Sequence, residues 1–303
     1  LDTINDRVIV FNTDGRYLMQ WGNEGSEDGQ FNLPSSLALA PDGRVYVTDS
    51  NNRRIQVFSA EGEYVTQWGT PGTGEGQFGT LADIEVAPDG RVYVSDWGNN
   101  RVQVFSEDGA YLMELGGIVH PSGIAIASDG RVYVSEQDNG RIWVFSRDGD
   151  YIFQWGSQGS AAGQFERPYD LAISSTNQIY VLENYGHRIQ KFNSDGGYEH
   201  KWGLWGSSNG NFQYPRGIAI APNNEIYVSD ANARIQIFSE EGNYITQFGT
   251  KGVGEGEFYG QTVLSIAQDG RIYAADIENQ RIQVIKPVDN PNNSKAIVVA
   301  AGG

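Results

Sequence analysis

The sequence predicts an all-β protein folded as a propeller, and three observations lead to this prediction. A unit of about 40 to 47 residues recurs along the 303-residue chain. Each unit contains four short segments with the pattern of a β-strand, separated by turn residues. The 39 glycines are spread at regular intervals, so they mark many tight turns. Four short antiparallel strands in each repeat are what a propeller blade requires.

The first two strands of each unit are expected to form a hairpin. Residues 36–40 read Ser-Leu-Ala-Leu-Ala, in which large aliphatic residues alternate with alanine, as in a strand. The turn Pro-Asp-Gly-Arg follows at 41–44, because aspartate can bond back to the main chain and glycine accepts a positive φ angle. Residues 45–47, Val-Tyr-Val, begin the second strand. Copies of the first strand start near Asp83, Gly123, Asp170, Gly217 and Val263.

The third and fourth strands complete each predicted sheet. The third reads Arg-Ile-Gln-Val-Phe at 54–58, and the fourth reads Tyr-Val-Thr-Gln-Trp-Gly at 64–69. The glycine-rich residues 72–78 then cross from this outer strand to the inner strand of the next unit. Blades converge toward the propeller axis, so small residues are expected on the first strand and Tyr and Trp at the wider rim.

The repeats predict six blades and one additional half-blade. The blades are residues 33–69, 79–116, 120–156, 167–203, 214–249 and 260–303, and residues 1–22 supply only a third and a fourth strand. Six first strands set a six-bladed ring, while seven blades remain an alternative if upstream residues were lost. Either terminal strand pair could close the ring, and the other would then cap an edge or join a neighbouring molecule by β-augmentation.

These motifs together resemble NHL repeats. The resemblance rests on Gly-Gln-Phe, a following proline and aliphatic strand, Asp-Gly-Arg-Val-Tyr-Val, and Arg-Ile-Gln-Val-Phe. It covers nearly the whole chain, is clearest over 29–68 and 76–115, and is weakest after Ile285. The resemblance implies a six-bladed propeller. Some similar proteins are zinc-dependent lyases that process peptide C-termini, and some NHL domains bind RNA through a basic face.

Composition excludes several classes of function. With 21 Lys and Arg against 38 Asp and Glu, the formal charge of −17 argues against binding nucleic acid. No apolar run approaches the length that spans a bilayer, so we expect no membrane insertion. The chain has no cysteine, which removes disulfides and thiolate metal sites. Its acidity, its lack of cysteine and an acceptor-like Asn-Asn-Ser at 292–294 favour an extracellular location without establishing one.

A carboxylate, an asparagine and an arginine recur at fixed spacing, as in Asp49, Asn52 and Arg54. Carboxylates that recur around a ring suggest metal binding or acid–base chemistry. A residue present in most blades is better explained by the blade itself, here by capping the loop between the second and third strands and pairing with arginine. We therefore interpret this motif as structural.

Binding residues are expected where a blade departs from the repeat, on the face that carries the connections between blades. The predicted ligand-binding residues at the mouth of the channel are His120, Arg167, Tyr169, Asp170, Tyr214 and Arg216. Trp97, Tyr185 and Trp205 are off-pattern aromatic residues on the same face. Such aromatic residues anchor partners, or they pack onto adjacent loops. The third blade has a shortened connection at 116–121, which predicts a notch.

No cofactor is predicted, and calcium is the one ion left open. His120 and His187 could reach the loop face, but His200 falls in a fourth strand at the rim, so three histidines cannot form a zinc site. Asp83 and Asp170 are the weak candidates for a calcium site in the channel. No catalytic residue is assigned, because the chain contains neither a nucleophile elbow nor a phosphate-binding glycine loop.

Three functions follow, in decreasing order of support. The first is a non-catalytic binding or scaffold propeller that presents one loop face to a protein, peptide or glycan. The second is a structural subunit that self-assembles into a homo-oligomer by exchanging terminal strands. The third is a metal-dependent lyase or hydrolase of the propeller type.

Overall fold

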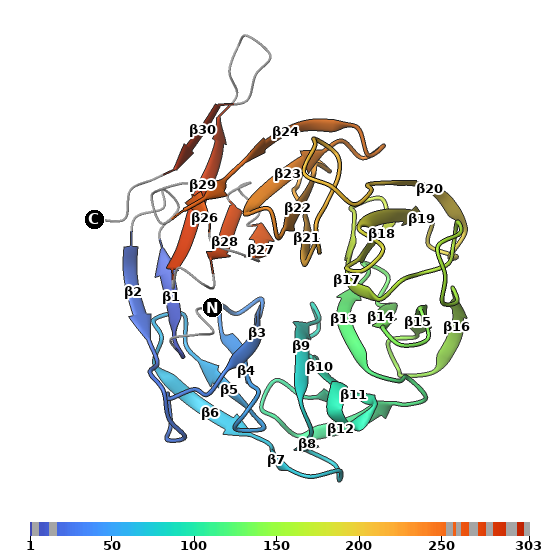
Figure 1. Ribbon diagram of the computed structural model, residues 1–303. Helices are drawn as coiled ribbons and strands as arrows, with labels where there is room; N and C mark the ends of the chain where they lie inside the picture. Colours follow the sequence, from blue (N-terminus) through green and yellow to red (C-terminus); the bar gives the residue numbers. More distant parts are fainter. Residues whose placement is uncertain are drawn as a thin grey trace. The chain divides into compact units, whose positions relative to one another are not determined.

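The computed structural model describes residues 1, 6–11, 17–252, 257–258, 262–266, 272–276, 281–288 and 296–299. These residues contain six four-stranded antiparallel sheets, each formed by four strands that are consecutive in the chain (Figure 1). The predicted all-β fold with four-stranded antiparallel blades is therefore confirmed. Among the described residues no helix is long and apolar enough to cross a membrane. The motif at 292–294 lies outside the described residues.

The chain divides into two compact units, chiefly Gln20–Leu171 (unit 1) and Ala172–Gly303 (unit 2). Unit 1 contains three complete sheets. Their strands are β3 (Pro34–Leu39), β4 (Val45–Asp49), β5 (Arg54–Phe58) and β6 (Tyr64–Trp68); β9 (Leu81–Val86), β10 (Val92–Asp96), β11 (Arg101–Phe105) and β12 (Tyr111–Leu115); and β13 (Pro121–Ile126), β14 (Val132–Glu136), β15 (Arg141–Phe145) and β16 (Tyr151–Trp155). Among the first strands of these sheets, β9 contacts both β3 and β13.

The remaining sheets lie in unit 2, apart from the start of β17. Their strands are β17 (Pro168–Ile173), β18 (Ile179–Glu183), β19 (Arg188–Phe192) and β20 (Tyr198–Trp202); β21 (Gly217–Ile220), β22 (Ile226–Asp230), β23 (Arg234–Phe238) and β24 (Tyr244–Phe248); and β27 (Thr262–Ile266), β28 (Ile272–Asp276), β29 (Arg281–Val288) and β30 (Ala296–Val299).

The smaller sheets are two-stranded. β1 (Val8–Phe11) pairs only with β2 (Tyr17–Trp21) among the described residues. Val8 and Trp21 pack with Phe31 and Phe58, a residue of β5. The C-terminal strands β29 and β30 belong to the sheet that begins with β27. The parallel pairs β7 (Thr70–Pro71) with β8 (Gln77–Phe78) and β25 (Thr250–Lys251) with β26 (Glu257–Phe258) lie in connections between sheets.

The hairpin between β3 and β4 shows why these residues turn where they do. The main-chain N–H of Ala40 donates to the Arg44 carbonyl, and Gly43 takes a φ angle of 90°. The Asp42 carboxylate accepts the Arg44 N–H at 3.0 Å, which fixes the turn. The turn sets the register that pairs Leu39 with Val45.

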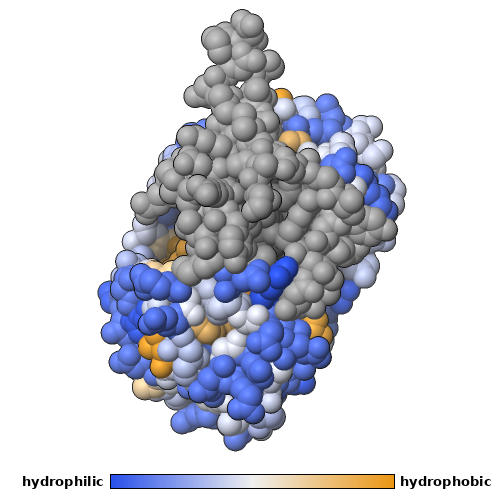
Figure 2. All heavy atoms as spheres, turned by 90° about the vertical axis from the view of Figure 1, so that its left-hand side faces the viewer, coloured by the Kyte–Doolittle hydropathy of each residue, from blue (hydrophilic) through white to orange (hydrophobic). Residues whose placement is uncertain are grey.

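The core lies between successive sheets. Tyr46 of one sheet and Phe105 of the next are buried and share a cluster with Phe78, and the Trp68 ring lies 5.6 Å from the Phe105 ring. Burying each such aromatic side chain stabilises the fold by about 1.5–3 kcal/mol. On the face shown in Figure 2 the described residues are mostly hydrophilic, with hydrophobic residues in small separate groups. Burial of apolar surface is therefore concentrated between the sheets.

Replacing Gly69 with alanine is expected to destabilise the protein more than the same change at Gly76. A Cβ atom at Gly69 would lie 2.6 Å from the Phe78 ring and 2.9 Å from the Arg53 carbonyl oxygen, and the φ angle there is +108°. A Cβ atom at Gly76 meets nothing within 4 Å, and its φ of +67° is the left-handed conformation. We expect a loss of about 1 kcal/mol at Gly76 and at least about twice that at Gly69. Urea unfolding measures the stability of both variants. Equal losses of unfolding free energy would show that the close approach of Phe78 to Gly69 adds nothing to the cost.

Candidate functional site

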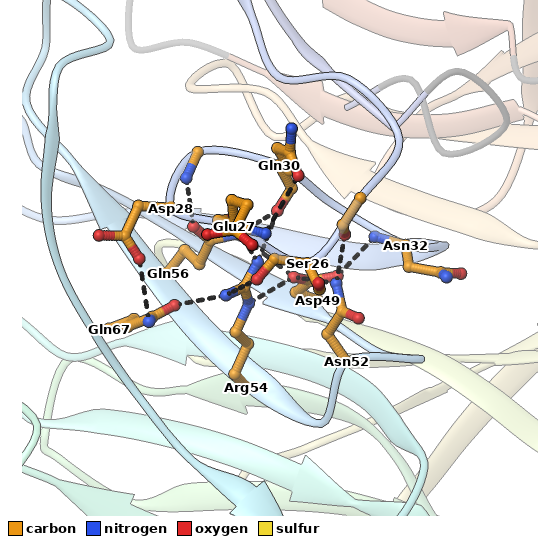
Figure 3. A network of polar contacts seen from close by, with 12 residues as sticks. Ser26, Glu27, Asp28, Gln30, Asn32, Asp49, Asn52, Arg54, Gln56 and Gln67 are labelled. Atoms are coloured by element: carbon orange, nitrogen blue, oxygen red, sulfur yellow. Dashed lines mark hydrogen bonds and ion pairs between the residues drawn. The ribbon is translucent and has the colours of Figure 1, made fainter.

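The recurring carboxylate, asparagine and arginine form a network that holds the glycine-rich connection before several of the sheets; Figure 3 shows the one before β3. We call this connection the strap; it runs over residues 22–33 before β3 and 69–80 before β9. Asp49 accepts hydrogen bonds from the Asn32 N–H, Asn52, Arg54 and Gln56. Arg54 also donates to the strap carbonyls of Ser26, Glu27 and Gln30, at 2.8 Å each. These hydrogen bonds tie the strap to strands β4 and β5 of the same blade.

The same network recurs in other blades of both units. Arg101 bonds Asp96 and the carbonyls of Gly74 and Gln77. Arg234 bonds Asp230 and the carbonyls of Ser207, Ser208 and Asn211. These arginines and carboxylates are almost completely buried. The interpretation of the motif as structural is therefore confirmed for these blades.

A residue at the entry to the first strand of a sheet adopts a left-handed backbone in several blades. The φ angles are 49° at Leu33, 49° at His120, 57° at Arg167 and 42° at Tyr214. This conformation costs a residue with a large side chain about 1–3 kcal/mol and is often found at binding sites. A side chain from the preceding strand pair or sheet accepts the N–H of this residue in three cases: Asp6 for Leu33, Asn100 for His120 and His187 for Tyr214.

In unit 1, Trp97 and His120 are brought together. Trp97 lies in the short 3-10 helix η2 (Trp97–Asn99), and its ring stacks on the His120 ring at 4.1 Å and 14°. His120 Nδ1 lies 2.6 Å from the Asp138 carboxylate. The two rings are half-buried, so they pack onto the loops and leave part of their surface open to solvent.

In unit 2, four aromatic rings form a cluster on two connections, β18–β19 and β20–β21, which we call the aromatic cluster. It consists of Tyr185, His187, Trp205 and Tyr214. The His187 ring lies 4.6 Å from Trp205 and 4.9 Å from Tyr214, and Tyr185 contacts Tyr214 edge-on at 5.8 Å. Exposed fractions are 52% for Tyr185, 55% for Trp205 and 39% for Tyr214. The contacts fix the rings while leaving large areas of them in solvent.

Hydrogen bonding orients the centre of this cluster. His187 Nδ1 accepts the Tyr214 N–H at 3.2 Å, so this nitrogen carries a lone pair rather than a proton. The adjacent Leu204 is 71% exposed and extends the apolar surface beside Trp205. An exposed apolar surface of this kind, built on fixed rings, is typical of a binding site.

Acidic residues gather on the inner strands of unit 1. Asp83 on β9 accepts the Ser36 hydroxyl at 2.7 Å and the Ile124 N–H at 2.9 Å, so it links β3 and β13. Burial raises the pKa of Asp83, and these two hydrogen bonds partly oppose that rise. Burial also raises the pKa of Glu85 to about 8, with smaller contributions from the carboxylates of Asp83 and Asp170.

The described residues provide no group of three or more His, Cys, Asp and Glu side chains arranged to hold a metal ion. Asp83 uses both carboxylate oxygens to link strands, and Asp170 accepts its neighbour's N–H at 2.8 Å. His200 lies in β20, the fourth strand of its sheet, as predicted.

The other predicted binding residues take separate places. Arg167 is exposed immediately before β17, and Tyr169 on β17 accepts the Ser122 hydroxyl through its carbonyl at 2.8 Å. Arg216 donates its main-chain N–H to the Ser229 carbonyl. Tyr214 and Arg216 belong to unit 2 and the other mouth residues to unit 1, so a shared binding mouth remains a prediction.

His187 and Leu204 were not predicted as binding residues. His187 directly precedes the third strand of its sheet, as Asn100 does in its own, and this shared position was the sequence signal that could have identified it.

Comparison with protein families decides the classification. Residues 117–215 and 204–284 match a family described as a 6-bladed β-propeller, and together these segments make up more than half of the chain. Residues 31–58 and 78–105 match the NHL repeat. The chain belongs to this β-propeller family and contains NHL repeats. The predicted family resemblance is thereby confirmed for the propeller.

Known structures and proteins show the same architecture. The propeller is similar to a structure of catalytically inactive virginiamycin B lyase from Staphylococcus aureus with quinupristin (TM-score 0.69, 16% identity, covering 97% of this chain and 86% of that one). It is also similar to a streptogramin B lyase (0.70, 14%, 100% and 90%) and to a chain of a nidogen/laminin complex (0.57, 18%, 74% and 82%). These identities show the fold alone.

One curated protein shares a local match. A segment of 50 residues is 42% identical to peptidyl-glycine alpha-amidating monooxygenase A of Xenopus laevis, which covers 15% of this chain and 5% of that protein. The propeller therefore spans a small fraction of the length of that relative.

Proposed function

We propose that this protein is a non-catalytic binding propeller whose loop face holds a protein or peptide partner, with the aromatic cluster as the principal contact. The observation that supports this is the exposure of Tyr185, Trp205 and Tyr214 despite their mutual packing. Large rings that are already fixed lose little conformational entropy on binding, so they contribute more to affinity than flexible side chains do. A glycan that stacks on the same rings is the other ligand class that this surface fits.

The structural network supports a binding role over catalysis. The recurring carboxylates accept hydrogen bonds from the arginines that hold the straps, as Asp49 does from Arg54 and Asp96 from Arg101. A metal-dependent lyase or hydrolase is less well supported, because the described residues lack a ready group of metal ligands. The fold shared with lyases carries no argument for their chemistry here.

Substitution of Trp205 by alanine is expected to weaken binding of peptides selected against this protein by at least about tenfold, because a central aromatic anchor contributes roughly 2 kcal/mol or more. The probes are peptides recovered from a random displayed library against the whole chain, and fluorescence anisotropy measures their affinity. A glycan array run in parallel tests the second ligand class.

The matched control is Leu112→Ser, which removes another exposed apolar side chain, 49% exposed, from the strand β12. It should leave the affinity unchanged. Selected peptides whose affinity survives both Trp205→Ala and Tyr185→Ala would place the binding surface elsewhere and overturn the assignment to this cluster.

Assembly through terminal strands is a second candidate. It is supported by the two-stranded sheet β1–β2, which packs against the first complete sheet while β29 and β30 complete the last one. We infer a ring of six blades, with β1 and β2 as the additional pair. Sedimentation velocity at high protein concentration tests this, and a monomer throughout the range would remove the assembly role.

A further inference from the structure

Arg141 differs from the corresponding arginines of its sister blades. Arg54, Arg101 and Arg234 each donate to two or more strap carbonyls and are only 5–8% exposed. Arg141, at the start of β15, is half-buried, and among the described residues its side chain has neither a hydrogen bond nor an ion pair. Its five N–H donors therefore lack the acceptors that the other blades provide.

The shortened connection explains this difference. Only residues 116–120 join β12 to β13, whereas residues 69–80 join β6 to β9. The short segment reaches Glu136, which accepts the Val119 N–H at 2.8 Å, but it contains no turn equivalent to Gly74–Gln77 that could reach the arginine. Ile118 is buried beside Trp143, so the apolar part of the strap's place is filled. The strap carbonyls that bond the arginine in the sister blades have no counterpart here.

Two neighbouring side chains complete the site. Trp143 stands where the other sheets have glutamine, and its indole N–H donates to Glu136 at 2.9 Å, as Gln56 donates to Asp49 in the first complete sheet. The Gln154 Oε1 atom is buried and has no hydrogen-bond partner in the described structure. Its counterpart Gln67 accepts from Arg54 at 2.7 Å and donates to the strap residue Asp28. Gln154 lies opposite Trp143 in the strand register, as Gln67 lies opposite Gln56.

We propose that Arg141 and Gln154 form a docking site for a polypeptide turn of a partner, which supplies the carbonyl oxygens that an internal strap supplies to the arginines of the sister blades. An unpaired, half-buried guanidinium favours such acceptors, because charge-assisted hydrogen bonds are about twice as strong as neutral ones. The site lies in unit 1 and shares no residue with the aromatic cluster, so either proposal can fail without the other.

The test uses the whole chain and a peptide copied from its own strap. The probe is the acetylated and amidated sequence of residues 69–78, Gly-Thr-Pro-Gly-Thr-Gly-Glu-Gly-Gln-Phe. We expect it to shift the NMR signals of the Arg141 Nε–H and the Trp143 indole N–H. Arg141→Gln should weaken peptide binding at least about tenfold. Arg147→Gln removes an arginine whose side chain is 58% exposed, just after β15, and should leave binding unchanged.

Two further measurements decide between occupants. A chain in which residues 69–78 replace residues 116–118 should unfold at a higher temperature and no longer bind the peptide, because the internal strap then occupies the site. Equal binding of a scrambled peptide, or the same shifts with sodium acetate at matched concentration, would show a small-anion site only and overturn the proposal. Undiminished peptide binding by Arg141→Gln, or by the grafted chain, would overturn it as well.

Discussion

Replacing Asp49 with alanine is expected to lower the free energy of unfolding by about 3–5 kcal/mol, because it leaves the Arg54 guanidinium buried without its anionic partner. Asp49 has no exposed surface, and its two oxygens accept hydrogen bonds from one main-chain N–H and three side chains. Its loss also removes the bond between β4 and the strap residue Asn32. Urea unfolding followed by tryptophan fluorescence measures the change.

The control is Asp42→Ala, which removes a carboxylate that also pairs with an arginine, Arg44, at 2.6 Å. The side chain of Asp42 is 49% exposed. Exposed pairs contribute only about 0–1 kcal/mol, so the loss should be several times smaller than at Asp49. Comparable losses for the two variants would show that burial of the network does not determine its contribution.

Glu85→Gln is expected to stabilise the protein at pH 8 by about 2–4 kcal/mol and to have little effect at pH 4. Burial raises the pKa of Glu85 from 4.5 to about 8, so the folded protein holds a proton that the unfolded chain releases. Below pH 4.5 the side chain is neutral in both states. Between pH 4.5 and 8 folding requires uptake of a proton, so stability falls as the pH rises, and above pH 8 the full cost of burying the charge remains.

Thermal unfolding of both proteins from pH 4 to pH 8.5 measures this difference. The gain from the substitution should grow through the window and then level off. Glu107→Gln provides the comparison, since the Glu107 side chain is 57% exposed and pairs with Arg44. A constant difference between Glu85→Gln and the native chain across the range would contradict the raised pKa.

Most of the architecture could be predicted because each repeat contains its own local signals. The Pro-Asp-Gly-Arg turn, the alternation in β3 and the Arg-Ile-Gln-Val-Phe strand each favour one conformation, and the structure pairs them as expected. The structural role of Asp49 could also be predicted, because a residue that every blade needs recurs in nearly every blade. Periodicity therefore identifies both the strands and the residues that hold them.

The binding surface was harder to predict because it depends on contacts between consecutive repeats. His187 joins Trp205 and Tyr214 through a loop of the preceding sheet, and no pattern within a single repeat shows that. The isolation of Arg141 likewise follows from a deletion upstream of it. The shortened connection was visible in the sequence, but the loss of hydrogen-bond acceptors became apparent only when the arginines were compared in space.

The strap also determines which segment of the chain a gene duplication can copy together with all its hydrogen-bond partners. Arg54 and Gln56 hold residues that come before β3, so the elements that depend on one another start directly after a fourth strand and end with the next one. A gene duplication that copies this stretch would carry a guanidinium together with all its carbonyls, whereas one that began at a first strand would separate them. Lineages that gain or lose blades should therefore show their junctions immediately downstream of the Trp-Gly pair that ends the fourth strand of several repeats.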